Sequence, residues 1–347
     1  MQSGRLRIGI IGLNFGRHIL SDLDSGSASQ HLSLGAVCDL DAAKVQQYSE
    51  QYSVKGYTDM DELLADPDID VVGLYTGPKG RAGLLSHIIR SGKDVITTKP
   101  FELDPEATKA VLDEAKSIGR IIHLNSPTPK PNAFMEQIHA WEQKCNLGKL
   151  VYFGGEATAS YREEADGSWL DDPERCPVAP IFRLGIYLIN DMVRIAGGIE
   201  SLQVLGTRVF TKRPTMDNAN LSMTFENGAI GNIYASFCVK NGQHYGNSLI
   251  LHYENGSIYR NCDIQDFGTA MQESHLRLVT VDADNQQTTH EWRQPGGSGQ
   301  YAWSDFCEAV RTRDITSTPA DAIVHGVQVI EAMIRAQNSS QVEKVKH

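Results

Sequence analysis

Short apolar runs alternate with amphipathic segments along the first 146 residues of the chain. The runs fall at residues 7–12, 32–39, 70–76, 94–100 and 120–125. Between them, apolar residues recur at helical spacing, at about 16–26, 41–53, 60–66, 80–91, 104–118 and 132–145. Strands rich in Val and Ile that alternate with helices are typical of βαβ units. We therefore predict a doubly wound parallel sheet for this part of the chain.

The rhythm changes after about residue 148, where runs of alternating apolar and polar residues begin. Asn-Gly pairs at 227–228, 241–242 and 255–256 are strong signals for tight hairpin turns. Two further helical patterns, at about 300–312 and 319–337, close the chain. The predicted fold class is α/β, with the parallel-sheet domain at residues 1–125 and an α+β domain with a mostly antiparallel sheet at 126–347. Whether the C-terminal helix packs back on the first domain stays open.

One predicted helix of the second half carries a polar stripe on an otherwise apolar surface. In and just after the stretch IFRLGIYLIND (181–191), Arg183, Tyr187, Asn190 and Arg194 stand at the spacing of one helix face. A helix that is apolar nearly all round is normally covered by other structure. The stripe is therefore either the wall of a binding cleft or a satisfied internal polar network. The polar residues 162–180 before it predict a loop over a cleft.

The composition argues against several classes of protein. With 347 residues, of which 41% are hydrophobic and 22% charged, the chain is long enough for two globular domains. A net charge of −11 argues against a nucleic-acid binder. The six cysteines form no C-x-x-C pair, so no zinc site is signalled. We expect a cytoplasmic protein with no metal site, no signal peptide and no membrane contact.

The turn after the first predicted strand has the character of a dinucleotide-binding loop. In GIIGLNFGRHI, Gly12 stands where a tight turn aims helix amides at a pyrophosphate. Asn14 takes the place of the usual second glycine, and the last glycine is Gly16. Asp39 ends the second predicted strand, at the position of a carboxylate that binds ribose hydroxyls. Together, the loop and the acid predict a Rossmann domain that binds a dinucleotide.

The acidic residues at this position also bear on the choice of cofactor. Asp39 and Asp41 would meet the 2′-phosphate of NADP with negative charge, so we expect NAD, with NADP less favoured. Arg17, near the loop, argues in the other direction. The alternative is that the loop is a structural turn without a ligand, and that Asp39 or Asp41 only caps the following helix.

A lysine follows a buried strand in the stretch GKDVITTKPFEL. Thr98, Lys99 and Pro100 stand at the C-terminal end of a predicted parallel strand, which is the edge of such a sheet where ligands bind. A lysine between a buried strand and a proline is held better than an ordinary surface lysine, and Pro100 is a candidate for a cis peptide bond. A solvated surface lysine is the alternative.

The order of these features resembles the glucose–fructose oxidoreductase/inositol dehydrogenase family (Gfo/Idh/MocA), from Arg5 to about Ala336. The family carries Glu-Lys-Pro where this chain has Thr98-Lys99-Pro100, so the lysine and proline match and the glutamate is absent. The resemblance implies that Lys99 hydrogen-bonds the reacting oxygen and assists hydride transfer electrostatically. It also implies a homo-oligomer, a dimer or a tetramer. The stretch YTGPKGRAGLL (75–85) lies where the family has a cofactor loop.

The polar helix is where the chain departs from the family pattern. Aligned on Gly185, the family's acid is replaced by Arg183, its proton-transferring histidine by Tyr187, and its second acid by Asn190. In one interpretation Tyr187 is the acid/base, because a phenol near positive charge can carry a proton. In another, the site has lost its chemistry and serves as a sensor. A satisfied structural network is the third.

The candidate site residues fall into three groups. The catalytic candidates are Lys99 and Tyr187. The residues expected to bind the cofactor are Gly12, Leu13, Asn14, Phe15, Gly16, Asp39, Thr76, Lys99, Pro100 and Asn125. Those expected to contact substrate are Arg183, Asn190, Tyr161 and Trp169.

These residues together predict an NAD(P)-dependent oxidoreductase. It would transfer a hydride between the nicotinamide and a secondary alcohol or carbonyl of a sugar, inositol or related polyol. One alternative is a non-catalytic NAD- or sugar-binding regulatory protein. Another is an enzyme that uses transient oxidation for elimination or glycosidic cleavage and returns NAD unchanged.

Overall fold

The chain folds into two compact units in a computed structural model, which describes residues 4–161, 163–241, 245–267, 273–282, 284–296 and 299–346. The first unit comprises Met1–Pro129 and Tyr301–Ala320, and the second Lys130–Gln300 and Asp321–His347. The segment Tyr301–Ala320, which the sequence analysis placed in the second domain, therefore belongs to the first unit. Among the described residues, no helix is both long enough and apolar enough to span a bilayer.

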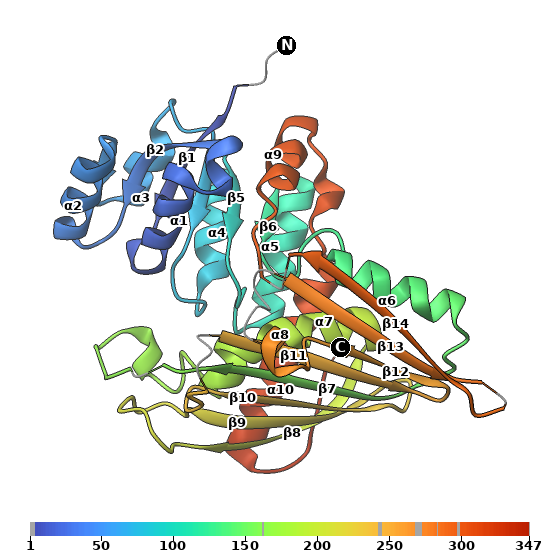
Figure 1. The fold of residues 1–347 in the computed structure, drawn as a ribbon. Helices are drawn as coiled ribbons and strands as arrows, with labels where there is room; N and C mark the ends of the chain where they lie inside the picture. Colours follow the sequence, from blue (N-terminus) through green and yellow to red (C-terminus); the bar gives the residue numbers. More distant parts are fainter. Residues whose placement is uncertain are drawn as a thin grey trace. The chain divides into compact units, whose positions relative to one another are not determined.

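The first unit contains a six-stranded sheet in the order β3-β2-β1-β4-β5-β6, in which every pair of neighbours is parallel (Figure 1). Its strands are β1 (Leu6–Ile11), β2 (Leu32–Cys38), β3 (Lys55–Tyr57), β4 (Val71–Leu74), β5 (Asp94–Thr97) and β6 (Ile122–Leu124). Its α-helices are α1 (Leu13–Ser25), α2 (Ala42–Tyr52), α3 (Met60–Ala65), α4 (Arg81–Arg90), α5 (Pro105–Ser117) and α9 (Trp303–Thr312). The predicted doubly wound parallel sheet is confirmed.

Apolar strand residues and the returning helix α9 share one core in this unit. Ile8, Ile10 and Ile96 from the sheet and Trp303 and Phe306 from α9 are all buried in it. The strand order reverses between β1 and β4, because β2 lies on one side of β1 and β4 on the other. In open α/β sheets, ligands bind outside the carboxyl ends of the strands at such a point.

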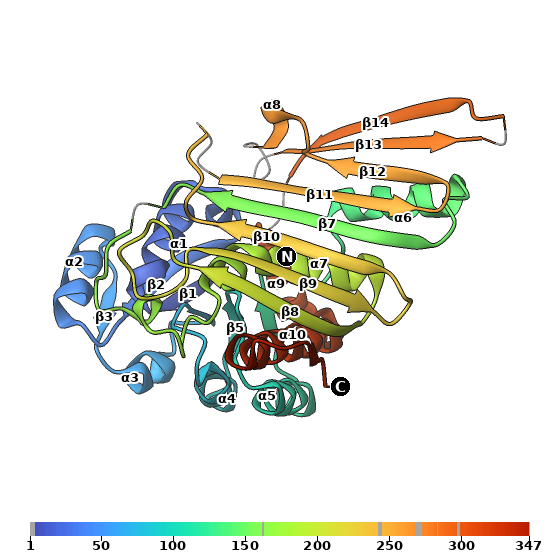
Figure 2. The same ribbon diagram turned by 90° about the horizontal axis from the view of Figure 1, so that it is seen from below.

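The second unit contains a nine-stranded sheet in the order β14-β13-β12-β11-β7-β10-β9-β8-β15 (Figure 2). The strands are β7 (Leu150–Ala159), β8 (Ile199–Thr207), β9 (Asn218–Phe225), β10 (Ile230–Ser236), β11 (Tyr245–Tyr253), β12 (Gly256–Arg260), β13 (Glu273–Val281), β14 (Gln287–Pro295) and β15 (Glu343–Lys344). The helices are α6 (Ala133–Lys144), α7 (Ile186–Ala196), α8 (Ile264–Phe267) and α10 (Ala320–Ser339). Among the described strands of this second sheet, only β10 and β7 pair in parallel, so the prediction of a mostly antiparallel sheet is confirmed.

Helix α7 covers one face of this sheet. A Cβ atom on Gly155 of β7 would lie 2.9 Å from Leu188 of α7, so the missing side chain allows the close approach. Two of the predicted Asn-Gly turns connect β9 to β10 and β11 to β12, and Gly228 has a φ of 86°. The third, at 241–242, lies partly outside the described residues.

The polar helix begins differently from the prediction. The sequence pattern predicts one regular helix through 181–191, whereas the structure has a π-helical turn over Ile181–Gly185, directly before α7. A π-turn closes its hydrogen bonds over five residues and is therefore wider than an α-turn. The regular helical spacing that puts Arg183 on the face of Tyr187 and Asn190 therefore does not apply across this turn.

Candidate functional site

The turn between β1 and α1 is built around two close backbone approaches. Gly12 has a φ of 90°, and its amide donates to the Cys38 carbonyl at 2.9 Å. A Cβ atom on Gly12 would lie 2.8 Å from the Tyr75 carbonyl oxygen, so only glycine fits. At Gly16 a Cβ atom would lie 3.0 Å from Ile10, which packs the first turn of α1 onto the sheet.

The first turn of α1 has no cap from the side chain of its own N-cap residue, Gly12. Asn14 and Phe15 are exposed. The amides of a first helical turn have no acceptor within the helix and attract anions. Gly12, Leu13, Asn14, Phe15 and Gly16 therefore lie together at one end of the sheet, in the arrangement that a pyrophosphate needs.

Asp39 follows β2 and is fixed against this turn. Its Oδ2 accepts from the Leu13 amide at 2.7 Å, and its Oδ1 accepts from the Asp41 amide at 3.0 Å. Asp41 is the N-cap of α2 and accepts from the amides of Ala43 and Lys44. The hydrogen bond from the Lys44 amide lowers the pKa of Asp41. The capping role that the sequence left open thus belongs to Asp41.

A buried arginine ties together the segments that follow β4 and β5. Arg81, at the start of α4, donates to the carbonyl oxygens of Thr76, Thr98 and Pro100. Glu102 is also buried, and its two oxygens accept from the amides of Gly80 and Ala82. The sequence analysis missed both residues. No local spacing signals them, because their partners lie in backbone segments up to 22 residues away in the sequence.

Lys99 lies directly after β5, in a backbone that its neighbours hold. Its peptide bond to Pro100 is cis, as the sequence suggested. Its amide donates to Oδ1 of Asn125 at 3.0 Å, and the Thr98 hydroxyl lies 3.4 Å from the same atom. Asn125 is buried at the end of β6. Asn125 therefore fixes the backbone that presents Lys99, a role that the sequence analysis did not assign to it.

The same edge of the sheet holds a buried polar atom without a partner. Oγ1 of Thr76, after β4, is buried and has no hydrogen-bond partner among the described residues. Such orphaned groups are rare and usually mark a place for a ligand or water. With the first turn of α1 and Asp39, Thr76 makes this edge fit a dinucleotide.

In the second unit, Arg183 belongs to an ion pair. Its two terminal nitrogens each donate to one oxygen of Glu163, both at 2.7 Å. Its guanidinium carbon lies 4.6 Å from the ring centroid of Phe237 and 5.2 Å from that of Tyr161. Burial opposes ionisation of Glu163, but the hydrogen bond from Arg183 prevails and lowers its pKa. The predicted contact of Arg183 with substrate stays a prediction.

A second arginine organises the polar loop before the helix. Arg213 contacts the carboxylates of Glu163, Asp166 and Asp171 at 2.6–3.1 Å. Trp169 begins a short 3₁₀ turn in this loop, and its ring meets that of Phe182 edge-on at 6.4 Å. Tyr161 and Trp169 are both half-buried, so each keeps part of its ring accessible. The loop is thus held by charge pairs rather than by an apolar core.

Tyr187 and Asn190 lie on α7 and are each packed against a glycine. The ring of Tyr187 lies so close to Gly299 that any Cβ atom there would overlap it. A Cβ atom on Gly326 of α10 would lie 3.0 Å from Oδ1 of Asn190. Tyr187 is half-buried and Asn190 is buried. The structure therefore places Tyr187 where its ring is fixed but part of it remains accessible.

The residue after Asn190 belongs to a buried network that the sequence analysis missed. Asp191 is buried. The burial of Arg260 lowers the pKa of that arginine, and the negative charge of Asp191 opposes this effect. Arg260 donates to Asn247 at 2.7 Å, and its guanidinium carbon lies 4.3 Å from the ring centroid of Phe134. Full burial and these contacts indicate a structural role.

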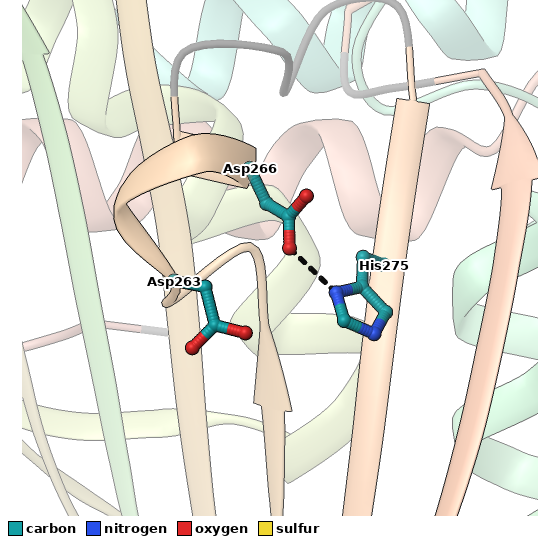
Figure 3. A group of neighbouring side chains, drawn as sticks. All are labelled: Asp263, Asp266 and His275. Atoms are coloured by element: carbon teal, nitrogen blue, oxygen red, sulfur yellow. Dashed lines mark hydrogen bonds and ion pairs between the residues drawn. The ribbon is translucent and has the colours of Figure 1, made fainter.

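One group of side chains in the described part of the chain has donor types that suit a metal ion. Asp263, Asp266 and His275 place one ligand atom each within 4.8 Å of the others, around the short helix α8 (Figure 3). Nδ1 of His275 lies 2.6 Å from Oδ2 of Asp266. Two carboxylates and an imidazole would be reasonable ligands for a divalent cation.

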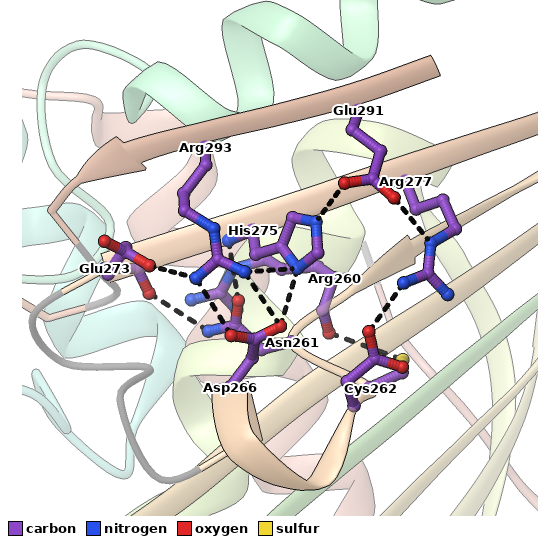
Figure 4. Close-up of polar contacts among 10 residues, drawn as sticks. Arg260, Asn261, Cys262, Asp266, Glu273, His275, Arg277, Glu291 and Arg293 are labelled. Carbon is purple, nitrogen blue, oxygen red and sulfur yellow. Dashed lines mark hydrogen bonds and ion pairs between the residues drawn. The ribbon is translucent and has the colours of Figure 1, made fainter. Parts of the chain in front are cut away.

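The surroundings of this group argue against a metal. Arg277 donates to Asp263 at 2.6 Å, and Arg293 donates to both oxygens of Asp266 (Figure 4). Nη2 of Arg293 also lies 3.0 Å from Nδ1 of His275. Each carboxylate is therefore already neutralised by a guanidinium that would repel a cation. We interpret the group as an ion-pair network that holds α8 to β13 and β14.

Comparisons with known proteins agree with this architecture. Residues 6–126 match the family model of the Gfo/Idh/MocA oxidoreductases, described as an NAD-binding Rossmann fold. Residues 135–259 match the model of a Gfo/Idh/MocA C-terminal domain. The two matched regions together span more than half of the chain.

Individual relatives are distant. The chain is 27% identical to an inositol 2-dehydrogenase/D-chiro-inositol 3-dehydrogenase of Lactiplantibacillus plantarum over 117 residues, which is 33% of either protein. The alignments with the first curated relatives span 33–38% of those proteins' length.

Solved structures are similar over the whole chain. A levoglucosan dehydrogenase in complex with NADH has a TM-score of 0.74 at 15% identity, with 99% of this chain and 100% of that chain covered. A 3-ketoreductase from Actinomadura kijaniata, in complex with TDP-benzene and NADP, has a TM-score of 0.72 at 17% identity, with 95% and 96% covered. At these identities, the likeness shows the fold.

Proposed function

Since the chain belongs to the Gfo/Idh/MocA family of oxidoreductases, we propose that it transfers a hydride between a nicotinamide cofactor and a secondary alcohol or carbonyl of a sugar, inositol or related polyol. The observation that carries this proposal is the set of groups at one edge of the parallel sheet. The turn at Gly12, Asp39 and Lys99 follow β1, β2 and β5, whose carboxyl ends meet there. A pure sensor would need the dinucleotide turn but not a lysine held by Asn125.

Each catalytic residue has a separate proposed role in the reaction. When bound, the cofactor supplies the carbon that accepts or donates the hydride. Lys99 donates a hydrogen bond to the reacting oxygen and stabilises the negative charge that develops on it. Tyr187 would act as a phenolate that takes the hydroxyl proton in oxidation, and as the phenol that returns a proton in reduction.

NAD is the proposed cofactor. Asp39 is fixed beside the first turn of α1, and Asp41 is two residues further along. The ribose hydroxyls of NAD donate to a carboxylate, whereas the 2′-phosphate of NADP is repelled by one. Thr76, Pro100 and Asn125 complete the proposed cofactor side.

The substrate is proposed to be an uncharged polyol. Both terminal nitrogens of Arg183 donate to Glu163, so the charge of the guanidinium is already balanced by a carboxylate. Asn190, Tyr161 and Trp169 are proposed contacts, because an amide and aromatic rings suit hydroxyl groups and the apolar faces of sugar rings. Arg183 is proposed to contact substrate hydroxyl groups through its remaining N–H groups and to hold the loop that carries Trp169.

The test is the absorbance of reduced nicotinamide after the protein is mixed with NAD and a panel of sugars and inositols. We expect NADH to form with at least one member of the panel. Lys99→Met should lower kcat about a hundredfold or more, since a hydrogen bond to developing charge is lost. Tyr187→Phe should lower kcat and remove the corresponding limb of the pH profile.

The other outcomes separate the alternatives. Tight binding of NAD without turnover of any polyol would support a non-catalytic regulatory protein. Product formed without net NADH would support transient oxidation, with NAD returned unchanged. Full activity of the Tyr187→Phe variant would exclude the phenol as the proton carrier.

We also propose a homo-oligomer formed through the sheet of the second unit. The face opposite α7 carries Leu205 and Ile230, whose exposed fractions are 68% and 55%. Tyr152 and Tyr234 lie on the same face, since they occupy alternate positions of paired strands. This face also carries the polar residues Asn220, Ser222 and Asn232. Its large exposed apolar side chains make it the proposed surface for a partner. Sedimentation should show a dimer or tetramer that Ile230→Lys dissociates, whereas a monomer would contradict the proposal.

All six cysteines are free thiols, which is consistent with a reducing compartment. The proposed location is therefore the cytoplasm.

A further inference from the structure

A lysine bridges the two turns that form the adenosine end of the proposed cofactor site. Nζ of Lys44, in the first turn of α2, donates to Oδ1 of Asn14, in the first turn of α1, at 2.7 Å. The same ammonium lies 3.5 Å from Oδ2 of Asp41. Because β1 and β2 are parallel neighbours, the turns that follow them lie side by side. The bridge therefore spans from the glycine turn to the turn that carries the acidic residues.

Asp39 lies between the two ends of this bridge. One of its oxygens accepts from Leu13, the residue before Asn14, and the other accepts from Asp41, the acidic partner of Lys44. A carboxylate at this position binds the adenosine ribose of a dinucleotide. The ammonium of Lys44 thus lies in the same two turns as the proposed ribose-binding carboxylate, at the end of the site that distinguishes NAD from NADP.

Two observations separate this bridge from an ordinary surface ion pair. Surface pairs are usually mobile and contribute little, but only 35% of the Lys44 side chain is exposed. The ammonium also has a second acceptor besides the half-exposed carboxylate of Asp41, because it donates to Asn14, which stands where the dinucleotide fingerprint normally has glycine. Asn14 restricts the backbone of the loop more than glycine would, and its side-chain amide holds the ammonium of Lys44 in one direction.

We infer that Lys44, held by Asn14, sets the discrimination between NAD and NADP at this site. Asp39 and Asp41 alone would strongly reject a 2′-phosphate. The ammonium offsets part of their charge and donates to the phosphate oxygens, so the preference for NAD is small. This inference rests on the proposed function only in that the site binds a dinucleotide, and it does not depend on the reaction or its substrate.

Binding of two nucleotides that lack nicotinamide tests the inference without any turnover. Adenosine 2′,5′-bisphosphate carries the 2′-phosphate and adenosine 5′-monophosphate does not. Calorimetry on the wild-type protein should give dissociation constants for the two within about tenfold of each other. Lys44→Met should weaken the binding of the bisphosphate by about ten- to hundredfold, because a hydrogen bond to a charged group is lost. The same variant should weaken the binding of the monophosphate by less than about threefold.

Two further variants separate charge from placement. Lys44→Arg keeps the cation and should keep most of the affinity for the bisphosphate. Asn14→Gly keeps Lys44 but removes its anchor, so an intermediate loss is expected. Equal weakening of both nucleotides by Lys44→Met, or no change in either, would overturn the inference. Failure of both nucleotides to bind the wild-type protein would instead remove the proposed cofactor site, and the inference with it.

Discussion

Tyr187 owes its position to a glycine that lies more than a hundred residues further along the chain. Gly299 has a φ of 83°, and its Cα lies against the Tyr187 ring with no room for a side chain. Gly299→Ala should therefore displace the phenol that we propose as the proton carrier. A displacement of about 1 Å can cost about a hundredfold in rate, so kcat should fall by about ten- to a hundredfold. The measurement is kcat with its pH profile, beside KM.

A second glycine provides the matched control. Gly228, in the turn between β9 and β10, has a φ of 86° and no atom near the position of a Cβ. Gly228→Ala imposes the same backbone strain without touching Tyr187, so it should lower stability but leave kcat unchanged. Equal losses of activity in both variants would show that Gly299 acts through folding alone.

The local sequence pattern predicts the role of a residue well when its hydrogen-bond partners are close in the sequence. Asp104 caps α5 by accepting from the amides of Glu106 and Ala107, as the sequence pattern of a helix start suggests. The bridge between Asn14 and Lys44 joins residues 30 positions apart. Its geometry depends on two turns being brought together by the sheet, which no local spacing encodes.

At the scale of elements, the π-turn before α7 carries Arg183, whose guanidinium pairs with Glu163 in the polar loop that precedes the helix. Glu163→Gln removes a carboxylate that contacts both Arg183 and Arg213. Only 16% of the Arg183 side chain and 24% of that of Glu163 are exposed, so we expect the free energy of unfolding to fall by about 2–3 kcal/mol. Urea unfolding measures this change, and limited proteolysis should show faster cleavage in the loop.

The neighbouring residue makes the same chemical change testable at an exposed pair. Glu164 pairs with Lys212, and their side chains are 70% and 75% exposed. Glu164→Gln should change stability by less than about 0.5 kcal/mol, because exposed ion pairs contribute little. If Glu164→Gln destabilised the protein as much as Glu163→Gln, net charge rather than the buried pair would explain the effect.

Elements that the pattern missed share a physical cause. Strand β3 has three residues and lies at the edge of its sheet, so it carries little periodicity. The π-turn has the composition of an ordinary buried helix, because its apolar residues Ile181, Phe182 and Leu184 are all buried. The regular strands of the first unit are continuous apolar runs and its helices have apolar residues at helical spacing, which is why their prediction is confirmed.

At the scale of the whole molecule, the return of Tyr301–Ala320 to the first unit was not predictable from periodicity. The pattern shows an amphipathic helix at α9 but not the surface against which it packs. Phe306 of α9 lies with its ring centroid 5.5 Å from that of His123 on β6. A late segment of the chain therefore completes the core around a residue of the parallel sheet.

His123 makes the stability of this core depend on pH. Its ring is buried, neither nitrogen has a hydrogen-bond partner among the described residues, and burial lowers its pKa from 6.5 to about 4. Below pH 6.5 the unfolded chain binds a proton that the folded state refuses, so stability is lost as the pH falls from 6.5 to about 4. The loss should reach about 3 kcal/mol at the acid end of this window.

His123→Leu should remove this acid sensitivity and leave the core packed against Phe306. Because two unpartnered nitrogens disappear, the variant should be as stable as the wild type or about 1–2 kcal/mol more stable at pH 7.5. Chemical denaturation at pH 7.5 and pH 4.5, followed by circular dichroism, measures both effects. His290→Leu, at an exposed position of β14, makes the same substitution without changing a core, so its acid sensitivity should match that of the wild type. If the wild-type protein and the His123→Leu variant lost equal stability between the two pH values, the acid-sensitive group would be a residue other than His123.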